Sequence, residues 1–521
     1  MSNIQKNYLI GMDCGTTNIK AILMGEDGSV VAEESRASAS IYVGADAVEQ
    51  DAREWWNNAV AVFRSIANRS GEEIMKRVRG IGISSHTVTM LPLDENREPL
   101  RNALTCQDGR SGKEMDQIVN AMGRKHFTSV VGGQPAVAFL PNKILWFKEH
   151  EPELFKRTKY YIQASSYLNM KLTGIMTMDL DQASRTQCLD INTMKWSKEI
   201  GNLIGVDLEA VMPELKSVDD IIGAVTKEAS GQTGLSEGIP VIAGCSDALA
   251  SMYAMGLKRL GDAGESSGTT SLVFAGCDKK SSSDVPVVTR PCTISGMPWI
   301  FDAPIQSSGS SIKWFIEKMA AQERREAEEK GIDIYTYLNE LALEARPGSG
   351  GLFFYPYLLG ERAPLWNDYA RGMLIGLGMD TTRSELVRSV FEGTAYALRQ
   401  VIETVKASGA RVDGLRICGG GAKSRTWCQI KASMLRVPVY VVDSESGDVP
   451  VGDVLLVGNS VGVFPDLAKA AEKIVKIKEV IHPVKEWADR YDRLYPYYVE
   501  MYQRLDESLK NLKETIKSDQ I

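Results

Sequence analysis

The sequence predicts an α/β protein of two large domains, on three observations. A chain of 521 residues is too long for one hydrophobic core, because domains usually hold about 100 to 250 residues. Apolar, strand-like runs alternate with helical patterns along its length. Gly-Thr-Thr follows an apolar strand at 15–17 and recurs at 268–270 at the start of another, which favours a duplicated domain. We place the boundary within 250–257, which gives domains 1–253 and 254–521.

The first segment, residues 8–34, predicts consecutive antiparallel strands. Asp27-Gly28 is a turn signal between two apolar runs, and Gly15 to Thr17 would then form the first hairpin turn. A long helical pattern covers residues 382–408. Further strands are predicted at 79–84, 239–244, 270–276 and 414–419.

The last segment, from Val484 onward, predicts an amphipathic helix, because apolar residues recur there at spacings of three, four and seven. Proline lacks the N–H of a helical bond, so we expect an interruption near Pro496. Core packing is enough to explain the periodic residues, which are Tyr491, Tyr495, Tyr498, Tyr502, Leu505, Leu509 and Leu512.

Composition and charge exclude several classes of protein. The 60 basic and 67 acidic residues give a net charge of −7 with no Lys/Arg-rich run, so nucleic acid is not an expected partner. The polar start MSNIQKN and the absence of a long apolar stretch predict a cytoplasmic protein without a membrane span. Eight scattered cysteines and four dispersed histidines show neither a zinc motif nor a disulfide framework.

The first hairpin turn carries residues suited to phosphate. Gly15 leaves backbone N–H groups open, Thr16 and Thr17 supply hydroxyl donors, and Lys20 adds a positive charge. The carboxylate of Asp13 would repel a phosphate unless a divalent cation lay between them, so the pairing favours a metal-nucleotide site. The alternative is that Asp13 caps the turn and the threonines satisfy their own backbone.

Three later segments strengthen the nucleotide hypothesis. A second donor-rich turn at 266–270 could close with the first on one polyphosphate. At 415–435 a strand runs into three glycines and a helix, with donors at Lys423 and Ser424, although neither the Walker A nor the Rossmann spacing is present. An apolar strand also delivers Asp247 to the domain boundary, where it would meet a ligand or, alternatively, act as a helix N-cap.

These segments together resemble the FGGY carbohydrate kinases, the sugar and polyol kinases of the actin-hexokinase-chaperone ATPase superfamily. The resemblance covers essentially the whole chain, and ERAPLWNDYARG (361–372) is specific to that family within the superfamily. Other matching segments are DCGTTNIKA (13–21), CQDGR (106–110), MDLDQASRT (178–186), AGCSDALA (243–250), SSGTTS (266–271), SGSSIKWF (308–315) and ICGGGAKSRTWCQIKA (417–432).

The resemblance implies two ribonuclease H-like domains of the actin-like ATPase fold around an interdomain cleft. MgATP would bind between them, and its γ-phosphoryl group would pass to a sugar held mainly by the first domain. Asp247 matches the catalytic base, and Asp13 and Asp247 match the carboxylates at Mg²⁺. The matching nucleotide contacts are Gly15, Thr16, Thr17, Lys20, Gly268, Thr269, Thr270, Gly309, Gly420, Gly421 and Ser424.

The predicted acceptor site departs from the family pattern. Cys106 replaces a usual Trp, which removes a large ring beside the sugar pocket, whereas Asp108 and Arg110 remain. The segment SSHTVTM matches neither the Gln-Met-His-Gly of xylulokinases nor the Asn-Gln-Arg-Glu of glycerol kinases. Its histidine is either a donor to a sugar hydroxyl or a structural residue. The predicted substrate contacts are Ser85, His86, Thr87, Val88, Asp108 and Asp247.

We therefore expect a sugar kinase that uses ATP and Mg²⁺, with a ketopentose such as xylulose as the first candidate acceptor. Glycerol, erythritol, ribulose and gluconate are alternative acceptors. A non-catalytic sugar-sensing regulator is disfavoured by retention of Asp13 and Asp247, and a mechanical actin-like ATPase is disfavoured by the acceptor loop and the ERAPLW segment. The expected partner is a small sugar or polyol, and a homodimer is a candidate assembly.

Overall fold

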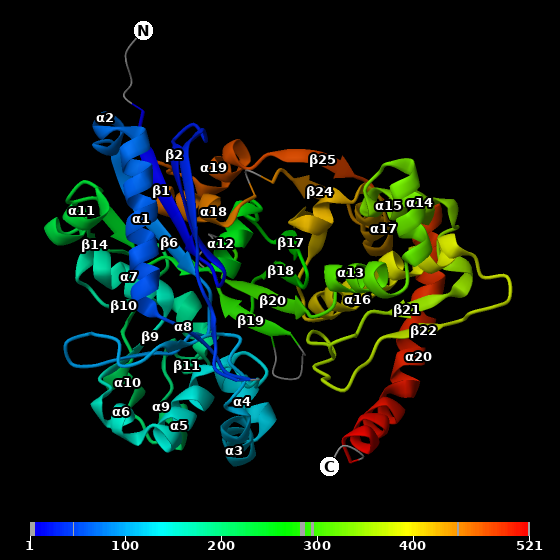
Figure 1. The fold of residues 1–521 in the computed structure, drawn as a ribbon, viewed down its shortest axis with the longest axis horizontal. Helices are drawn as coiled ribbons and strands as arrows, with labels where there is room; N and C mark the ends of the chain where they lie inside the picture. The colour runs from blue at the N-terminus through cyan, green and yellow to red at the C-terminus, as the bar shows by residue number, and fades with distance from the viewer. Residues whose placement is uncertain (1–5, 45, 282–286, 293–295, 445–446, 519–521) are drawn as a thin grey trace, which may run out of the picture.

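Two seven-stranded sheets form the frame of the described part of the molecule (Figure 1). The structure is a computed structural model that describes residues 6–44, 46–281, 287–292, 296–444 and 447–518. Within these ranges, none of the helices combines the length and the apolar character that crossing a bilayer requires.

The N-terminal sheet has the strand order β14-β15-β6-β1-β2-β3, with β16 also pairing with β6. β1 is antiparallel to β2 and parallel to β6, which is parallel to β15. The apolar strand β1 is almost wholly buried, as its sequence predicts. The strands are β1 (Tyr8–Cys14), β2 (Asn18–Gly25), β3 (Val30–Ala37), β6 (Val78–Ser85), β14 (Ile221–Ala224), β15 (Pro240–Ile242) and β16 (Cys245–Ser246).

The C-terminal sheet repeats this arrangement, with the order β19-β20-β18-β17-β23-β24-β25. β17 is antiparallel to β18 and parallel to β23, as β1 is to β2 and β6. The two Gly-Thr-Thr sequences therefore occupy equivalent hairpin turns, which fits the predicted duplication. The strands are β17 (Gly261–Ser267), β18 (Ser271–Cys277), β19 (Val288–Pro291), β20 (Trp299–Ile305), β23 (Val412–Cys418), β24 (Val439–Val442) and β25 (Ile477–Ile481).

Helices pack on both sheets, and further short strands lie in the connecting segments (Figure 1). On the N-terminal side these are α1 (Ala52–Ser70), α2 (Glu72–Met75), α3 (Gly112–Met122), α4 (Arg124–Val131), α5 (Leu140–His150), α6 (Pro152–Arg157), α7 (Ala164–Thr173), α8 (Leu180–Thr186), α9 (Lys198–Ile204), α10 (Leu208–Val211), α11 (Lys227–Thr233) and α12 (Asp247–Ala254), with β4 (Ile41–Tyr42), β5 (Val48–Gln50), β7 (Leu91–Leu93), β8 (Ala103–Leu104), β9 (Tyr160–Ile162), β10 (Thr177–Asp179), β11 (Leu189–Asp190), β12 (Lys195–Trp196) and β13 (Glu214–Lys216). The later elements are α13 (Gly309–Lys318), α14 (Ala321–Lys330), α15 (Ile334–Glu344), the 3₁₀ turns Ser349–Gly351 and Gly420–Lys423, β21 (Phe353–Tyr355), β22 (Met373–Ile375), α16 (Arg383–Ala407), α17 (Arg425–Leu435), α18 (Val449–Ser460), α19 (Leu467–Ile474) and α20 (Lys485–Ser518).

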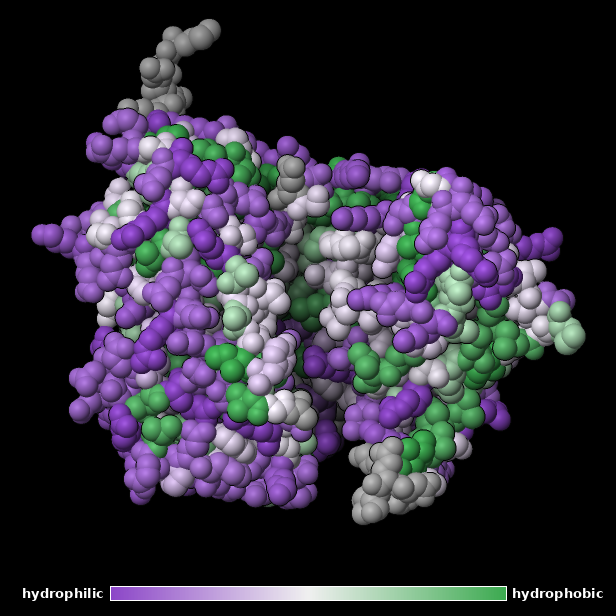
Figure 2. Space-filling view, in the orientation of Figure 1, coloured by the Kyte–Doolittle hydropathy of each residue, from purple (hydrophilic) through white to green (hydrophobic). Residues whose placement is uncertain are grey.

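The two halves share an apolar core and face each other across a cleft. One core lies between the N-terminal sheet and the helices α1, α7 and α11. On the other face of that sheet, α12, α18 and α19 pack together with side chains from the C-terminal sheet. Figure 2 shows the hollow between the two halves. The helix α18 comes late in the chain, yet it packs against β1 and β6 of the N-terminal sheet. The two halves of the fold are therefore not made of two strictly consecutive stretches of sequence.

Two predicted elements differ from the structure. The strand predicted at 239–244 ends at Ile242, because Gly244 adopts φ 79° and a Cβ there would collide with the carbonyl oxygen of Ile83. The helix α20 runs through Pro496 without the predicted interruption. Packing holds it there, because the buried Tyr498 ring stacks on Tyr355, whose hydroxyl donates to the Tyr498 carbonyl at 2.7 Å.

Candidate active site

Asp13 and Asp247 lie at the same edge of the N-terminal sheet. Asp13 is the penultimate residue of β1, and Asp247 follows β16, which pairs with the end of β6 as β1 does. Since these strands run parallel, their carboxyl ends meet at one edge. Burial and then the nearby charge of Asp247 raise the pKa of Asp13 well above its usual value. The two predicted carboxylates therefore interact electrostatically.

Asp247 is the first residue of the helix α12, and its environment raises its pKa above the ordinary value of an aspartate. Burial raises its pKa to about 6, against the opposing charge of Arg185. The Ala248 N–H donates to its Oδ1 at 2.7 Å. The helix N-cap is Ser246, whose hydroxyl accepts the Leu249 N–H, so the alternative interpretation of Asp247 as an N-cap is wrong.

A third carboxylate, Asp453 of α18, reaches the same edge and was not predicted. Its Oδ2 accepts the Ser84 hydroxyl at 2.8 Å, and that hydroxyl also lies 3.3 Å from Asp13 Oδ1. Among the described residues, no partner contacts its buried Oδ1. Burial and then the charge of Asp13 raise the pKa of Asp453 well above its usual value. The available signal was a lone aspartate within the apolar run VPVGDVLLVG.

The first hairpin turn places Gly15, Thr16 and Thr17 next to Asp13. The Thr16 carbonyl accepts Gln50 Nε2 at 2.7 Å and the Thr17 carbonyl accepts the Ser38 N–H at 2.8 Å, so backbone contacts outside the turn hold its shape. The threonine hydroxyls take no part in these bonds.

Lys20 lies opposite Asp13 in the β1–β2 pair. Its Nζ lies 2.6 Å from Glu33 Oε1 and 2.6 Å from Asp448 Oδ2. The predicted phosphate-binding ammonium is therefore neutralised by two carboxylates in this structure, and a phosphate would have to compete with them.

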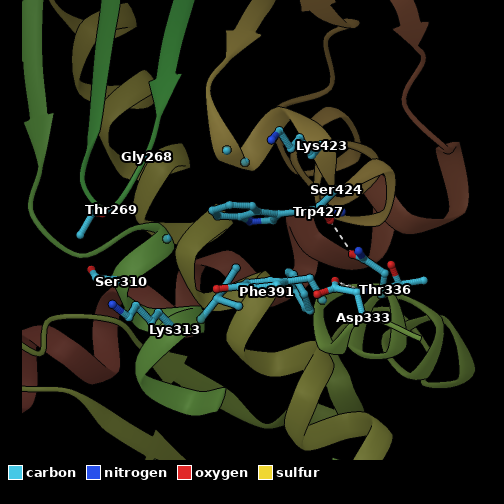
Figure 3. Close-up of a pocket in the computed structure, with 16 residues that line it drawn as sticks. Gly268, Thr269, Ser310, Lys313, Asp333, Thr336, Phe391, Lys423, Ser424 and Trp427 are labelled. Carbon is cyan, nitrogen blue, oxygen red and sulfur yellow. Dashed lines mark hydrogen bonds between the residues drawn. The ribbon is translucent and has the colours of Figure 1, made fainter. Parts of the chain in front are cut away.

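A cavity of about 620 Å³ lies in the C-terminal half, beside the second Gly-Thr-Thr turn (Figure 3). Its volume is in the range of small-molecule sites. The cavity contains six predicted nucleotide contacts, namely Gly268, Thr269, Gly309, Gly420, Gly421 and Ser424, whereas Thr270 and the four predicted residues of the first hairpin do not line it.

The N-terminus of α13 joins directly to this second turn. The Gly309 N–H donates to the Gly268 carbonyl at 3.1 Å, and the Ser310 N–H donates to the Thr269 carbonyl at 2.9 Å. A Cβ at position 309 would collide with the Gly268 carbonyl oxygen, so the close approach requires glycine.

Aromatic and polar side chains that the sequence did not single out complete the cavity. Figure 3 shows the Trp427 ring across from Phe391, with Thr269, Ser310 and Lys313 on one side. Ser424 acts as the N-cap of α17 by accepting the Trp427 N–H at 3.1 Å, and its hydroxyl donates to Asn339 Oδ1. An aromatic wall beside glycine-rich turns suits a ligand with a flat ring and a phosphate chain. Lys423, named above as a donor, also lines the cavity, and the unpredicted lining residues are Ser310, Ile312, Lys313, Asp333, Tyr335, Thr336, Asn339, Phe391 and Trp427.

His86 and Ser85 lie at the end of β6, near the Asp13 edge. His86 is buried, its Nδ1 lies 2.9 Å from the Cys14 carbonyl, and its Nε2 has no partner among the described residues. Since a carbonyl only accepts, Nδ1 carries the proton and Nε2 is an acceptor. The Ser85 hydroxyl donates to the His86 carbonyl and accepts from Ser165 N and Gln182 Nε2, so it is committed to the protein.

The other predicted acceptor residues lie in two loops. Thr87 is half-buried, and Val88 is buried with φ 63°, a left-handed conformation that is uncommon for a β-branched residue. Asp108 is fully buried and accepts the Val48 N–H at 2.9 Å, while Arg110 Nε contacts both of its oxygens. Through these contacts Asp108 fixes the conformation of the 106–110 loop.

Comparison with known proteins covers both halves of the chain. The N-terminal domain model of the FGGY family of carbohydrate kinases matches residues 8–254, and the C-terminal domain model matches residues 265–459. The xylulose kinase of Bacillus subtilis (strain 168) is 28% identical over 512 residues, 97% of this chain and 99% of that protein. The gluconokinase of the same organism is 26% identical over 511 residues, 98% of each chain.

Solved structures of sugar and polyol kinases resemble this fold along nearly its whole length. A xylulose kinase from Rhodospirillum rubrum superposes with a TM-score of 0.90 at 27% identity, covering 97% of this chain and 100% of that one. A Plasmodium falciparum glycerol kinase with ADP has a TM-score of 0.85 at 21% identity, covering 95% and 98%, and shows the shared actin-like ATPase fold. The chain therefore belongs to the FGGY family of carbohydrate kinases.

Proposed function

We propose that this sugar kinase transfers the γ-phosphoryl group of MgATP to a hydroxyl of a neutral sugar or polyol, with a ketopentose such as xylulose as the first candidate. The observation that carries the proposal is the half-buried Asp247 carboxylate, which shares one sheet edge with Asp13. Relatives named xylulose kinase support the choice of acceptor.

Asp247 would act as the general base. Phosphoryl transfer passes through a loose transition state, so the base needs only to orient the acceptor hydroxyl and take its proton late. Because the Ala248 N–H engages Oδ1, Oδ2 is the oxygen left for that proton. A pKa of about 6 keeps the carboxylate mostly ionised at neutral pH while leaving it more basic than an exposed aspartate.

The residues around Asp13 fit a divalent cation. Asp13 is half-buried and Asp453 is buried, neither forms an ion pair with a described basic residue, and the Asp453 Oδ1 lacks a hydrogen-bond partner. Such uncompensated charge is costly, and a hard cation with oxygen ligands would offset it. We propose that Asp13 and Asp247 hold Mg²⁺, with Asp453 behind them. When bound, Mg²⁺ would neutralise the charge on the transferred phosphoryl group.

The nucleotide would lie in the cavity of Figure 3, with its base beside Trp427 and Phe391 and its phosphates toward Gly268 and Thr269. The two Gly-Thr-Thr turns would then face the polyphosphate from both halves. Closure of the cleft seen in Figure 2 would exclude water from the transfer.

A neutral acceptor is favoured over a sugar acid such as gluconate by the local charges. Asp13, Asp247 and Asp453 make this edge acidic. The described cations near the acceptor loops are already engaged: Lys143 donates to the Val88 and Thr105 carbonyls, and burial lowers its pKa to about 7. An aldonate carboxylate would have to displace one of these carbonyl contacts to bind the Lys143 ammonium.

The test is release of ADP with and without a panel of pentuloses, polyols and aldonates. Release that depends on a neutral sugar supports the proposal, whereas turnover without sugar would indicate a mechanical ATPase and no turnover a sensor. Asp247→Asn should lower sugar-dependent turnover by several orders of magnitude and leave the affinity for metal-free ADP, measured by calorimetry, within about twofold of wild type. Near-normal turnover of that variant would remove Asp247 as the base.

A further inference from the structure

Three potential metal ligands from two helices converge in the N-terminal half, outside the site described above. Glu114 comes from α3, and Glu149 and His150 end α5. A carboxylate oxygen from each glutamate and a ring nitrogen of the histidine lie within 4.8 Å of one another. Figure 1 places both helices at the end of the N-terminal half that lies away from the helices of the nucleotide cavity.

Glu114 is the residue that distinguishes this group from an ordinary acidic surface. Its side chain is only 2% exposed, and its buried Oε2 has no hydrogen-bond partner in the described part of the chain. A buried carboxylate oxygen without a donor is unfavourable, and nearly all such atoms in folded proteins are paired. Because an oxygen of this carboxylate lies within 4.8 Å of ligand atoms of His150 and Glu149, a cation bound among them would supply a partner for the carboxylate.

The imidazole of His150 is held in an orientation suited to coordination. Its Nδ1 lies 2.9 Å from the Trp146 carbonyl, so Nδ1 carries the proton and Nε2 keeps its lone pair. The ring stacks on Trp146 with centroids 4.8 Å apart and planes 10° apart. A hydrogen bond from one ring nitrogen to a backbone carbonyl is the usual support for a metal-binding histidine.

We propose that Glu114, Glu149 and His150 bind one Zn²⁺ ion, with water as the fourth ligand. The mixture of one imidazole and two carboxylates suits zinc, whereas an all-oxygen set would suit Mg²⁺ or Ca²⁺. The ion would join α3 to α5. Because the Arg110 guanidinium lies 4.8 Å over the Trp146 ring on which His150 stacks, the ion would also brace the loop that carries Cys106 and Asp108.

The test is calorimetric titration of the full-length, metal-stripped protein with Zn²⁺. Wild type should bind one equivalent, and Glu114→Gln and His150→Ala should each weaken binding about tenfold or more. His126→Ala is the matched control, because His126 is an exposed histidine that faces the single carboxylate of Glu199, and it should keep wild-type affinity. Zn²⁺ should also raise the thermal midpoint of wild type but not of Glu114→Gln.

An Asp13→Asn background separates this site from the interdomain carboxylates. Retention of the zinc equivalent in that background supports the proposal, and its loss would assign the ion to the cleft instead. Equal zinc affinity in wild type, Glu114→Gln and His150→Ala would overturn the proposal. Since these readouts are binding and stability, they are independent of the kinase mechanism.

Discussion

The buried imidazole of His86 should make the stability of the N-terminal half sensitive to acid. Burial lowers its pKa to about 4, whereas an unfolded chain holds histidine near its ordinary value of about 6.5. Between these values the unfolded state binds more protons, so stability falls as pH falls from about 6.5 to about 4. His86→Gln should flatten this dependence by on the order of 3 kcal/mol across the window, measured as urea midpoints at a series of pH values. Parallel curves for the two proteins would contradict the prediction.

At the level of single residues, the sequence was informative where a polar group follows an apolar strand. Asp13 and Asp247 stand out for that reason, and both lie at one sheet edge. Asp453 did not stand out as part of the same site, because it is brought there by packing of α18 on β1 and β6. The sequence also did not predict that Glu33 and Asp448 pair with Lys20, because these ion pairs join distant segments of the chain.

At the level of elements, a buried ion pair supports the strand and helix that flank the nucleotide cavity. Lys431 of α17 lies 2.7 Å from Glu265 of β17, both are 1% exposed, and its Nζ lies 3.8 Å over the Trp427 ring. Lys431→Met leaves the carboxylate buried without a cation, so it should cost about 3–5 kcal/mol of unfolding free energy. The measurement is the thermal midpoint of each variant.

Two further variants decide whether that loss comes from the pair. Lys431→Met with Glu265→Gln should recover part of the stability, because the second change removes the unpaired charge. Lys469→Met, which removes an exposed lysine 3.5 Å from Asp466, should change unfolding free energy by no more than about 0.5 kcal/mol. No recovery in the double variant would mean that the loss reflects packing of the lysine stem.

Strands and long helices were predictable because their apolar periodicity is local. The helix α16 covers residues 383–407, against a predicted 382–408, and β6 and β23 match their predicted runs to within two residues. The interruption predicted at Pro496 was wrong. A proline locally favours a helix break, but the packing of Tyr491 and Tyr498 keeps α20 continuous. The strand predicted at 239–244 was too long, because the left-handed backbone of Gly244 ends it early.

At the level of the whole molecule, a chain of polar contacts connects the C-terminal sheet to the helix α12, which begins with the proposed base Asp247. Asp302 of β20 pairs with Arg185 of α8, and Arg185 Nε donates to Asp181 Oδ1 at 2.9 Å. Asp181 Oδ2 in turn accepts the N–H and hydroxyl of Ser246, the residue before Asp247. Two-domain architecture was predictable from length and duplication, but this connection required knowledge of which side chains meet between the halves.

That connection should tune the pKa of the proposed base, Asp247. Burial raises the pKa of Asp247 to about 6, Arg185 lowers it and Asp302 raises it. The proposed base must be ionised to accept a proton, so turnover should fall as pH drops through about 6. Arg185→Met should therefore move the acidic limb of the pH profile of kcat/KM to higher pH, and Asp302→Asn should move it to lower pH. The double variant should lie between them, because it removes both charges. If Arg185→Met loses stability but keeps the wild-type limb, the guanidinium holds the two halves together without acting on Asp247.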